Sequence, residues 1–134
     1  RLALEAHVAV TGLVEDARLL AYYRTAHLYL SASEHEGFGA PLVEAMWFDV
    51  PVLALNATAV PETLATAGML FTHDEELSSV AAHAYQLTHE KDARRTIIAA
   101  QRARRLDFTS AAVQPVLARL VERLTNATEF ESVA

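Results

Sequence analysis

Residues 33–46, which read SEHEGFGAPLVEAM, decide the fold because they join a flexible turn to an apolar, helix-like run. Gly37 and Gly39 have no side chains, so the backbone can turn sharply there and a ligand can approach it closely. Pro41 is typical of the first position of a helix, where its missing N–H leaves no hydrogen bond unmade. The stretch is therefore predicted to be a loop that leads from a strand into a helix.

Short apolar runs precede and follow this loop, and segments of helical spacing separate them. The runs are about strand length and apolar throughout, as expected of strands covered on both faces. They cover residues 7–11, 27–31, 51–55 and 68–71. Strands separated by helices imply crossover connections and a parallel sheet. The fold class is therefore predicted to be α/β, a Rossmann-like parallel sheet flanked by helices.

Apolar residues at helical spacing predict where the helices lie. They are expected from Asp16, from Pro41, over about 74–89, over about 91–106, and along an apolar stripe at 113–124 that Pro115 starts or kinks. Residues 125–134 lack periodicity and are expected to form a frayed tail. The length suits a single domain over residues 1–134.

Composition excludes several classes of protein. The net charge is −6 and Lys91 is the only lysine, whereas nucleic-acid binding needs a basic excess. There is no cysteine, so disulfides and thiol chemistry are excluded. No apolar run reaches the roughly 18 residues of a membrane span, and no signal peptide is visible. We therefore expect a cytoplasmic protein. Because the sequence begins at Arg1, we also expect it to be a segment of a longer chain.

The loop at residues 33–46 has the position of a ligand-binding loop. In an open parallel sheet, ligands bind at the carboxyl ends of strands, where the chain turns into helices. A helix that begins near Pro41 would present free N–H groups and a partial positive charge toward such a ligand. These features predict an anion site, most naturally for phosphate.

Glu36 and Glu44 need a separate explanation, because a carboxylate repels phosphate. Carboxylates are strong acceptors for hydroxyl groups, and each such hydrogen bond contributes roughly 1.5–3 kcal/mol. The ligand that satisfies both requirements is a diphosphate with hydroxyl-rich groups at its two ends. That description fits a nucleotide-sugar, with a ribose on one side and a hexose on the other.

A family resemblance supports this hypothesis. The segment EGFGAPLVE, from Glu36 to Glu44, followed by AM, resembles the signature of the retaining glycosyltransferases of family 4. The preceding VTGLVEDARLLAYYRTAHLYLSAS and the following PVLALNATAVPETLATAGMLF are similar to the neighbouring segments of that family, so the resemblance covers about residues 8–125. It implies most of the C-terminal donor domain of a GT-B enzyme. Such an enzyme transfers a sugar from a nucleoside diphosphate to an acceptor with retained anomeric configuration, without an essential metal or other cofactor.

The resemblance also implies a role for each residue of the motif. Glu36 would be the catalytic-site residue that contacts hydroxyls of the donor sugar, and Glu44 would hold the ribose hydroxyls. The backbone facing the sugar would be that of Gly37, Phe38 and Gly39. The backbone N–H groups directed at the diphosphate would be those of Ala40, Leu42 and Val43. The loop flanking the base would be formed by Gly12, Leu13 and Val14.

The sequence departs from the family pattern in two places. Trp47, Phe48 and Asp49 stand where the family often has a small residue and then a glycine. The basic pair that neutralises the diphosphate lies upstream of this segment in the family, as does the acceptor domain. We therefore expect the isolated segment to be inactive, and we expect any peripheral membrane contact to be made by the full-length protein.

Alternatives remain open at this point. Another GT-B enzyme, such as a sugar-nucleotide epimerase, or a non-catalytic nucleotide-sugar-binding or regulatory module would have a similar donor site. Outside the motif, Trp47 and Phe48 are expected in the core and Glu62 as a helix cap. A solvated helix face is expected from Lys91, Arg94, Arg95, Arg102 and Arg105.

Overall fold

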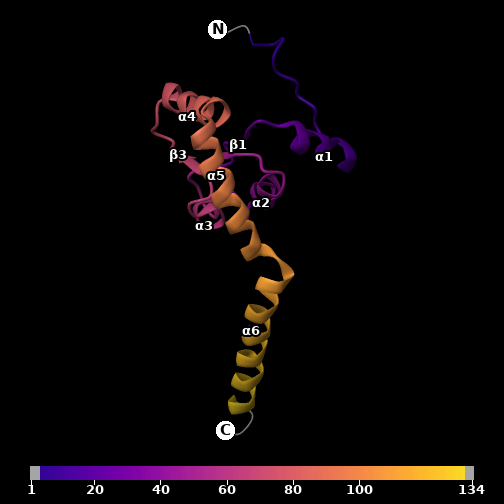
Figure 1. Ribbon diagram of the computed structural model, residues 1–134. Helices are drawn as coiled ribbons and strands as arrows, with labels where there is room; N and C mark the ends of the chain where they lie inside the picture. Colours follow the sequence, from indigo (N-terminus) through magenta and orange to yellow (C-terminus); the bar gives the residue numbers. More distant parts are fainter. Residues whose placement is uncertain (1–3, 132–134) are drawn as a thin grey trace.

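The computed structural model describes residues 4–131, with side chains described to residue 126. In chain order the elements are α1 (Asp16–Thr25), β1 (Tyr29–Ser31), α2 (Ala40–Trp47), β2 (Val52–Leu55), α3 (Val60–Leu64), β3 (Met69–Phe71), α4 (Leu77–His89), α5 (Lys91–Arg104), the 3-10 helix η1 (Arg105–Phe108) and α6 (Ser110–Glu131). Figure 1 shows helices α2 to α5 gathered around the sheet, whereas α6 projects away from it.

The sheet is parallel, with the strand order β1-β2-β3. Tyr29 pairs with Val52 across the first strand pair, and Leu53 pairs with Met69 across the second. All four residues of the central strand β2 are buried, which agrees with an apolar run covered on both faces. The predicted α/β class, a Rossmann-like parallel sheet flanked by helices, is confirmed.

The strand predicted over residues 7–11 is wrong. Residues 4–13 are exposed throughout, and Val10 is 94 % exposed. Within the described residues, the only strand pairs are β1 with β2 and β2 with β3. An apolar run becomes a strand only where a neighbouring backbone pairs with its N–H and C=O groups, and this run has none beside it. Its indigo trace stands apart from the sheet in Figure 1.

The core lies between α2 and one face of the sheet. Leu42, Ala45 and Met46 of α2 are at most 1 % exposed, and they pack in one cluster with Val52 and Ala54 of β2. These α2 positions follow the i, i+3, i+4 spacing that places side chains on one face of a helix. Burial of that face therefore fixes which α2 residues point away from the sheet.

The turn after α2 depends on Asp49, which adopts a left-handed backbone with φ 56°. Glycine adopts such a backbone without strain, whereas Asp49 holds a Cβ there. The Asp49 carboxylate also accepts hydrogen bonds from two guanidinium groups. Its Oδ1 lies 2.9 Å from Nε of Arg102 and 3.3 Å from Nη1 of Arg105. The turn is thus tied to α5 and η1.

Further bonds from α5 and η1 reach the same turn. Gln101 is fully buried and donates to the carbonyl of Val50 at 3.0 Å, while Arg105 donates to the carbonyl of Met46 at 2.9 Å. Arg94 donates to the carbonyl of His27 at 2.8 Å. The expected solvated basic face is therefore wrong for the half-buried Arg94 and Arg105, whose guanidinium groups bind other parts of the chain. Arg102 binds Asp49 but remains 59 % exposed.

The two aromatic residues after the motif differ in their surroundings. Phe48 is half-buried and stacks on Tyr23 with ring centres 5.4 Å apart, so its predicted core position is confirmed. Trp47 is 48 % exposed and lies beneath the guanidinium of Arg105, 4.6 Å from the ring centre. A cation–π contact, rather than core burial, therefore accounts for its position.

The last helix runs further than expected. α6 continues to Glu131 and contains Pro115, so the frayed tail predicted over 125–134 is helical to residue 131, and residues 132–134 lie outside the described residues. Its apolar stripe, from Val113 to Leu124, is about half exposed or more. Among the described helices, none combines the length and hydropathy that crossing a membrane requires.

Substitution of Asp49 tests the left-handed turn. Asp49→Ala should lower the free energy of unfolding by about 2 kcal/mol, because it removes charged hydrogen bonds and retains a Cβ at positive φ. Asp49→Gly loses the same bonds but adopts this backbone freely, so it should be about 0.5–1 kcal/mol more stable than Asp49→Ala. Urea unfolding followed by circular dichroism measures both, and equal stability of the two variants would contradict the role of the backbone.

A pH series tests the ion pair separately. The hydrogen bond from Arg102, with added attraction from nearby guanidinium charges, holds the pKa of Asp49 below its ordinary value. A carboxylate with a lowered folded-state pKa stabilises the fold fully above its unfolded pKa of about 3.9, and this contribution is lost as the pH falls through the folded-state pKa. The stability difference between wild type and Asp49→Asn should therefore be largest near neutral pH and shrink below about pH 4.

The control for this series is Asp92→Asn. The Asp92 carboxylate is 96 % exposed and lies 3.6 Å from Arg95, so its removal should change stability little at neutral pH or at acid pH. If the difference in stability between wild type and Asp49→Asn stays constant from pH 7 to the lowest pH of the series, the charge of Asp49 does not stabilise the fold.

Candidate functional site

The loop between β1 and α2 is shaped by Gly39 rather than by Gly37. Gly39 is the N-cap of α2 with φ 80°, and a Cβ at this position would lie 2.7 Å from Cδ1 of Leu42. A Cβ added to Gly37 would meet open space. Gly39 is therefore the glycine that the entry into α2 requires, both for its backbone conformation and for its contact with Leu42.

The first turn of α2 limits which backbone groups can bind an anion. The N–H of Leu42 donates to the carbonyl of Gly39 at 2.9 Å, and Pro41 has no N–H. Of the three N–H groups predicted to face a diphosphate, that of Leu42 is thus already engaged within the turn. Val43 is the fourth residue of α2, where the N–H ordinarily bonds back to the N-cap carbonyl, so Ala40 is the predicted donor that the helix itself leaves free.

Thr58 holds the backbone of Glu36 from the neighbouring loop. The N–H of Glu36 donates to Oγ1 of Thr58 at 2.9 Å, and the Thr58 hydroxyl donates to the Glu36 carbonyl at 3.0 Å. Thr58 has φ 45°, a conformation that is unfavourable for a β-branched residue and that persists where surrounding contacts enforce it. Sequence reasoning missed Thr58; its position after β2, at the carboxyl end of a parallel strand, was the available signal.

Thr63 holds the next part of the loop. Its hydroxyl donates to the carbonyl of Phe38 at 2.5 Å, and its side chain is 3 % exposed. The ring of Phe38 meets Phe108 of η1 edge to face, with centres 5.4 Å apart. Arg104 in turn donates to the carbonyl of Thr63 at 3.1 Å. The backbone from Glu36 to Phe38 is therefore held by Thr58 and by Thr63 of α3, which lie outside the motif, and the end of α5 in turn binds α3.

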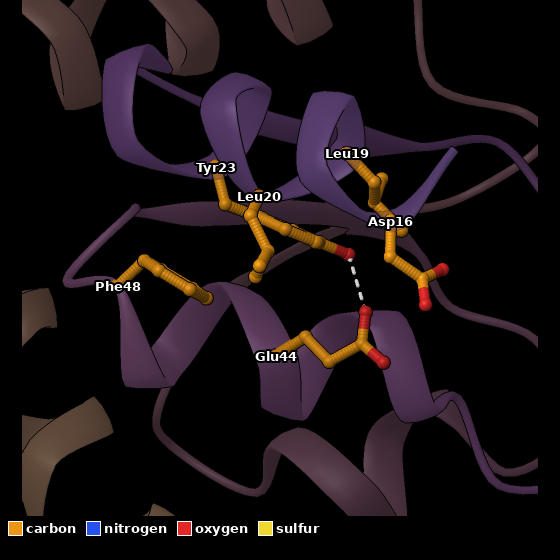
Figure 2. Close-up of a pocket in the computed structure, with 6 residues that line it drawn as sticks. All are labelled: Asp16, Leu19, Leu20, Tyr23, Glu44 and Phe48. Carbon is orange, nitrogen blue, oxygen red and sulfur yellow. Dashed lines mark hydrogen bonds between the residues drawn. The ribbon is translucent and has the colours of Figure 1, made fainter. Parts of the chain in front are cut away.

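Glu44 points away from the buried face of α2 and toward α1. Its Oε2 accepts a hydrogen bond from the hydroxyl of Tyr23 at 2.8 Å (Figure 2). The two residues border a pocket of about 320 Å³. The pocket is lined by Asp16, Leu19, Leu20, Tyr23, Glu44 and Phe48. Glu44 therefore presents a carboxylate to a cavity that has apolar walls.

A second pocket borders the other side of Glu44. Its volume is about 520 Å³ and its walls are largely apolar. Its remaining lining residues are Phe38, Ala40, Val43, Trp47, Phe108 and Val113. The exposed carboxylate of Glu44 is thus accessible between two cavities, one beside α1 and one beside η1 and α6.

The charges of the two motif glutamates act on one tyrosine. Burial raises the pKa of Tyr29, and the negative charges of Glu36 and then Glu44 raise it further. Tyr29 begins β1, the strand that leads into the loop carrying both glutamates. Burial, followed by the hydrogen bond to Glu44, also raises the pKa of Tyr23.

Other predicted site residues stand apart from this group. Gly12 has φ 59° in an exposed turn, the side chain of Leu13 is fully exposed, and the two pockets that Glu44 borders are formed without residues 12–14.

Glu62 lies in the first turn of α3, where a negative charge is favourable, but no side-chain hydrogen bond caps that helix. Among the described side chains, no three histidines or carboxylates gather where they could hold a metal ion.

The chain is similar to known proteins over most of its length. Residues 1–104 match the family model described as glycosyl transferases group 1. The chain is 34 % identical over 82 residues to the O-antigen chain mannosyltransferase B of Escherichia coli, a match that covers 61 % of this chain and 21 % of that protein.

Two further relatives have related names. The chain is 38 % identical over 65 residues to the serotype-specific mannosyltransferase WbdA of Escherichia coli. This match covers 48 % of this chain and 8 % of that protein. It is 28 % identical over 92 residues to a 2-deoxystreptamine N-acetyl-D-glucosaminyltransferase of Niallia circulans, and this match covers 63 % of this chain and 22 % of that protein. The chain thus spans about a fifth or less of the length of these relatives. Because the family model matches 104 of its 134 residues, the chain belongs to the glycosyl transferases group 1 family.

Proposed function

We propose that the protein transfers a hexosyl group from a nucleoside diphosphate sugar to an acceptor with retention of the anomeric configuration, and that residues 33–46 bind this donor. The observation that carries the proposal is the placement of Glu36 and Glu44, which lie before and after the first turn of α2. Two carboxylates on either side of a helix N-terminus suit a ligand with hydroxyl groups on either side of a diphosphate.

In this proposal the donor lies across the entry to α2. The diphosphate faces the N–H of Ala40 at the start of α2, the sugar faces Glu36 and the backbone of Gly37 to Gly39, and the ribose faces Glu44. Negative charge grows on the departing diphosphate in the oxocarbenium-like transition state, and the partial positive charge of the helix N-terminus stabilises it. The rigid attachment of the Glu36 backbone to Thr58 supports a fixed sugar position.

The names of the relatives support a proposal for the sugar. Two of them are named mannosyltransferases and one an N-acetyl-D-glucosaminyltransferase, so we propose a hexose, with mannose first. The resemblance to retaining family 4 enzymes implies that the full-length protein also supplies an acceptor-binding domain and a basic pair for the diphosphate, and that no metal takes part. The proposed reaction contains no step that needs one.

Glu44→Ala tests the ribose contact. The substitution should weaken binding of UDP or GDP to the full-length protein about tenfold or more, because it removes carboxylate hydrogen bonds to the ribose hydroxyls. Calorimetry measures the affinity, and Glu34→Ala on the exposed part of the same loop is the matched control. Unchanged affinity for both nucleotides would remove Glu44 from the site.

Glu36→Gln tests the sugar contact. Its proposed partner is the sugar rather than the nucleotide, so turnover should fall at least about tenfold while the affinity for UDP or GDP changes little. Release of nucleoside diphosphate from UDP- and GDP-hexoses by the full-length protein measures turnover, with Glu34→Gln as the control. If nucleotide affinity collapses while turnover stays near that of the wild type, the roles of the two glutamates are exchanged. Binding without any release would instead favour a non-catalytic module.

A further inference from the structure

Tyr23 of α1 has a ring that the core holds in place. The residue is 7 % exposed. Its ring stacks on Phe48 at 5.4 Å with an interplanar angle of 8°, and on Tyr29 at 6.2 Å with an angle of 26°. A tyrosine ring fixed on both sides in this way has only its hydroxyl proton left to reorient.

The hydroxyl of this fixed ring meets the carboxylate of Glu44. The Tyr23 hydroxyl lies 2.8 Å from Oε2 of Glu44 and 3.4 Å from the carbonyl of Pro41, so the carboxylate is the closer acceptor. Figure 2 shows the two side chains meeting at the edge of the pocket, which is also lined by the apolar side chains of Leu19 and Leu20 and by the carboxylate of Asp16. Within the described residues, this is the one hydrogen bond that the structure gives the Glu44 carboxylate.

We propose that Tyr23 is a positioning residue that holds the carboxylate of Glu44 in the orientation in which it accepts the ribose hydroxyls of the donor. The inference rests on the proposed function of Glu44. An exposed glutamate samples several rotamers, and a ligand that binds it must first order the side chain, which lowers affinity. Tyr23 orders it before the ligand arrives, and leaves Oε1 available to the ribose.

The chemistry of the pair keeps Tyr23 a donor at every working pH. Burial and the negative charge of Glu44 both raise the pKa of Tyr23, so its hydroxyl keeps its proton where an exposed tyrosine would begin to lose it. Glu44 remains an acceptor with a second oxygen free, because the tyrosine engages only one. The geometry, a rigid donor against a carboxylate at a pocket edge, is what assigns the role.

A double-mutant cycle tests the inference with UDP and GDP as probes. Tyr23→Phe keeps the ring stacking and removes only the hydroxyl. In the full-length protein it should weaken nucleotide binding about three- to tenfold, through loss of the preformed Glu44 orientation. The KM for the sugar donor should rise by a similar factor, while kcat stays within about twofold, because the sugar contacts are untouched. In a Glu44→Ala background the same substitution should have no further effect.

Tyr22→Phe is the matched control. Tyr22 is the preceding residue of α1 and is 40 % exposed, and its hydroxyl accepts from Arg18 at 2.9 Å. Its substitution should leave affinity unchanged. Thermal unfolding of each variant separates loss of folding from loss of binding, since a purely structural tyrosine would lower Tm without changing the KM of the folded protein.

The possible results separate the two proposals. If Glu44→Ala weakens binding but Tyr23→Phe does not, the positioning role is overturned and the proposed function stands. If Tyr23→Phe weakens binding equally with and without Glu44, Tyr23 acts independently and the inference is again overturned. If Glu44→Ala leaves affinity unchanged, or the wild-type protein binds neither nucleotide, the proposed ribose contact fails and the positioning role fails with it.

Discussion

The whole site depends on the burial of one face of α2 against β2. Leu42, Ala45 and Met46 lie in the core, so Glu44, on the opposite side of the same helix, must point outward. The helix is short, and each of its ends is set by a residue with positive φ: Gly39 before it and Asp49 after it. A shift of either turn would rotate or displace the helix, and the carboxylate of Glu44 would move with it.

Segments outside the motif hold this arrangement in place. Thr58 and Thr63 bind the loop backbone before α2, while Gln101, Arg102 and Arg105 bind the turn after it. The carboxylate of Asp49 thereby combines two tasks, because it occupies a left-handed position and receives two guanidinium groups. Such an ion pair adds to stability here because side-chain hydrogen bonds to backbone carbonyls join the same elements, so the pair does not stand alone at the surface.

The two glutamates differ in what holds them. The structure fixes Glu36 through its backbone, by means of Thr58, whereas Glu44 is fixed through its carboxylate, by means of Tyr23. A group that must contact a reacting sugar benefits from a fixed backbone and an unengaged carboxylate. A group that recognises ribose hydroxyls benefits from a preset carboxylate, because less conformational entropy is lost on binding. This difference agrees with separate roles for the two residues.

The sequence by itself determined the local features. Glycine and proline spacing gave the strand–loop–helix unit at residues 33–46, apolar runs gave three of the four predicted strands, and the order of elements gave a parallel sheet. These features depend on residues close in the chain, where periodicity and turn preferences act directly. Only the tertiary structure decided the rest: that residues 7–11 find no strand partner among the residues the structure describes, that Arg102 and Arg105 bind Asp49, and that Tyr23 and Thr58 hold the two glutamates. Those contacts join residues far apart in the sequence, and the side-chain pattern of one segment does not encode which distant backbone or hydroxyl will face it once the core has packed.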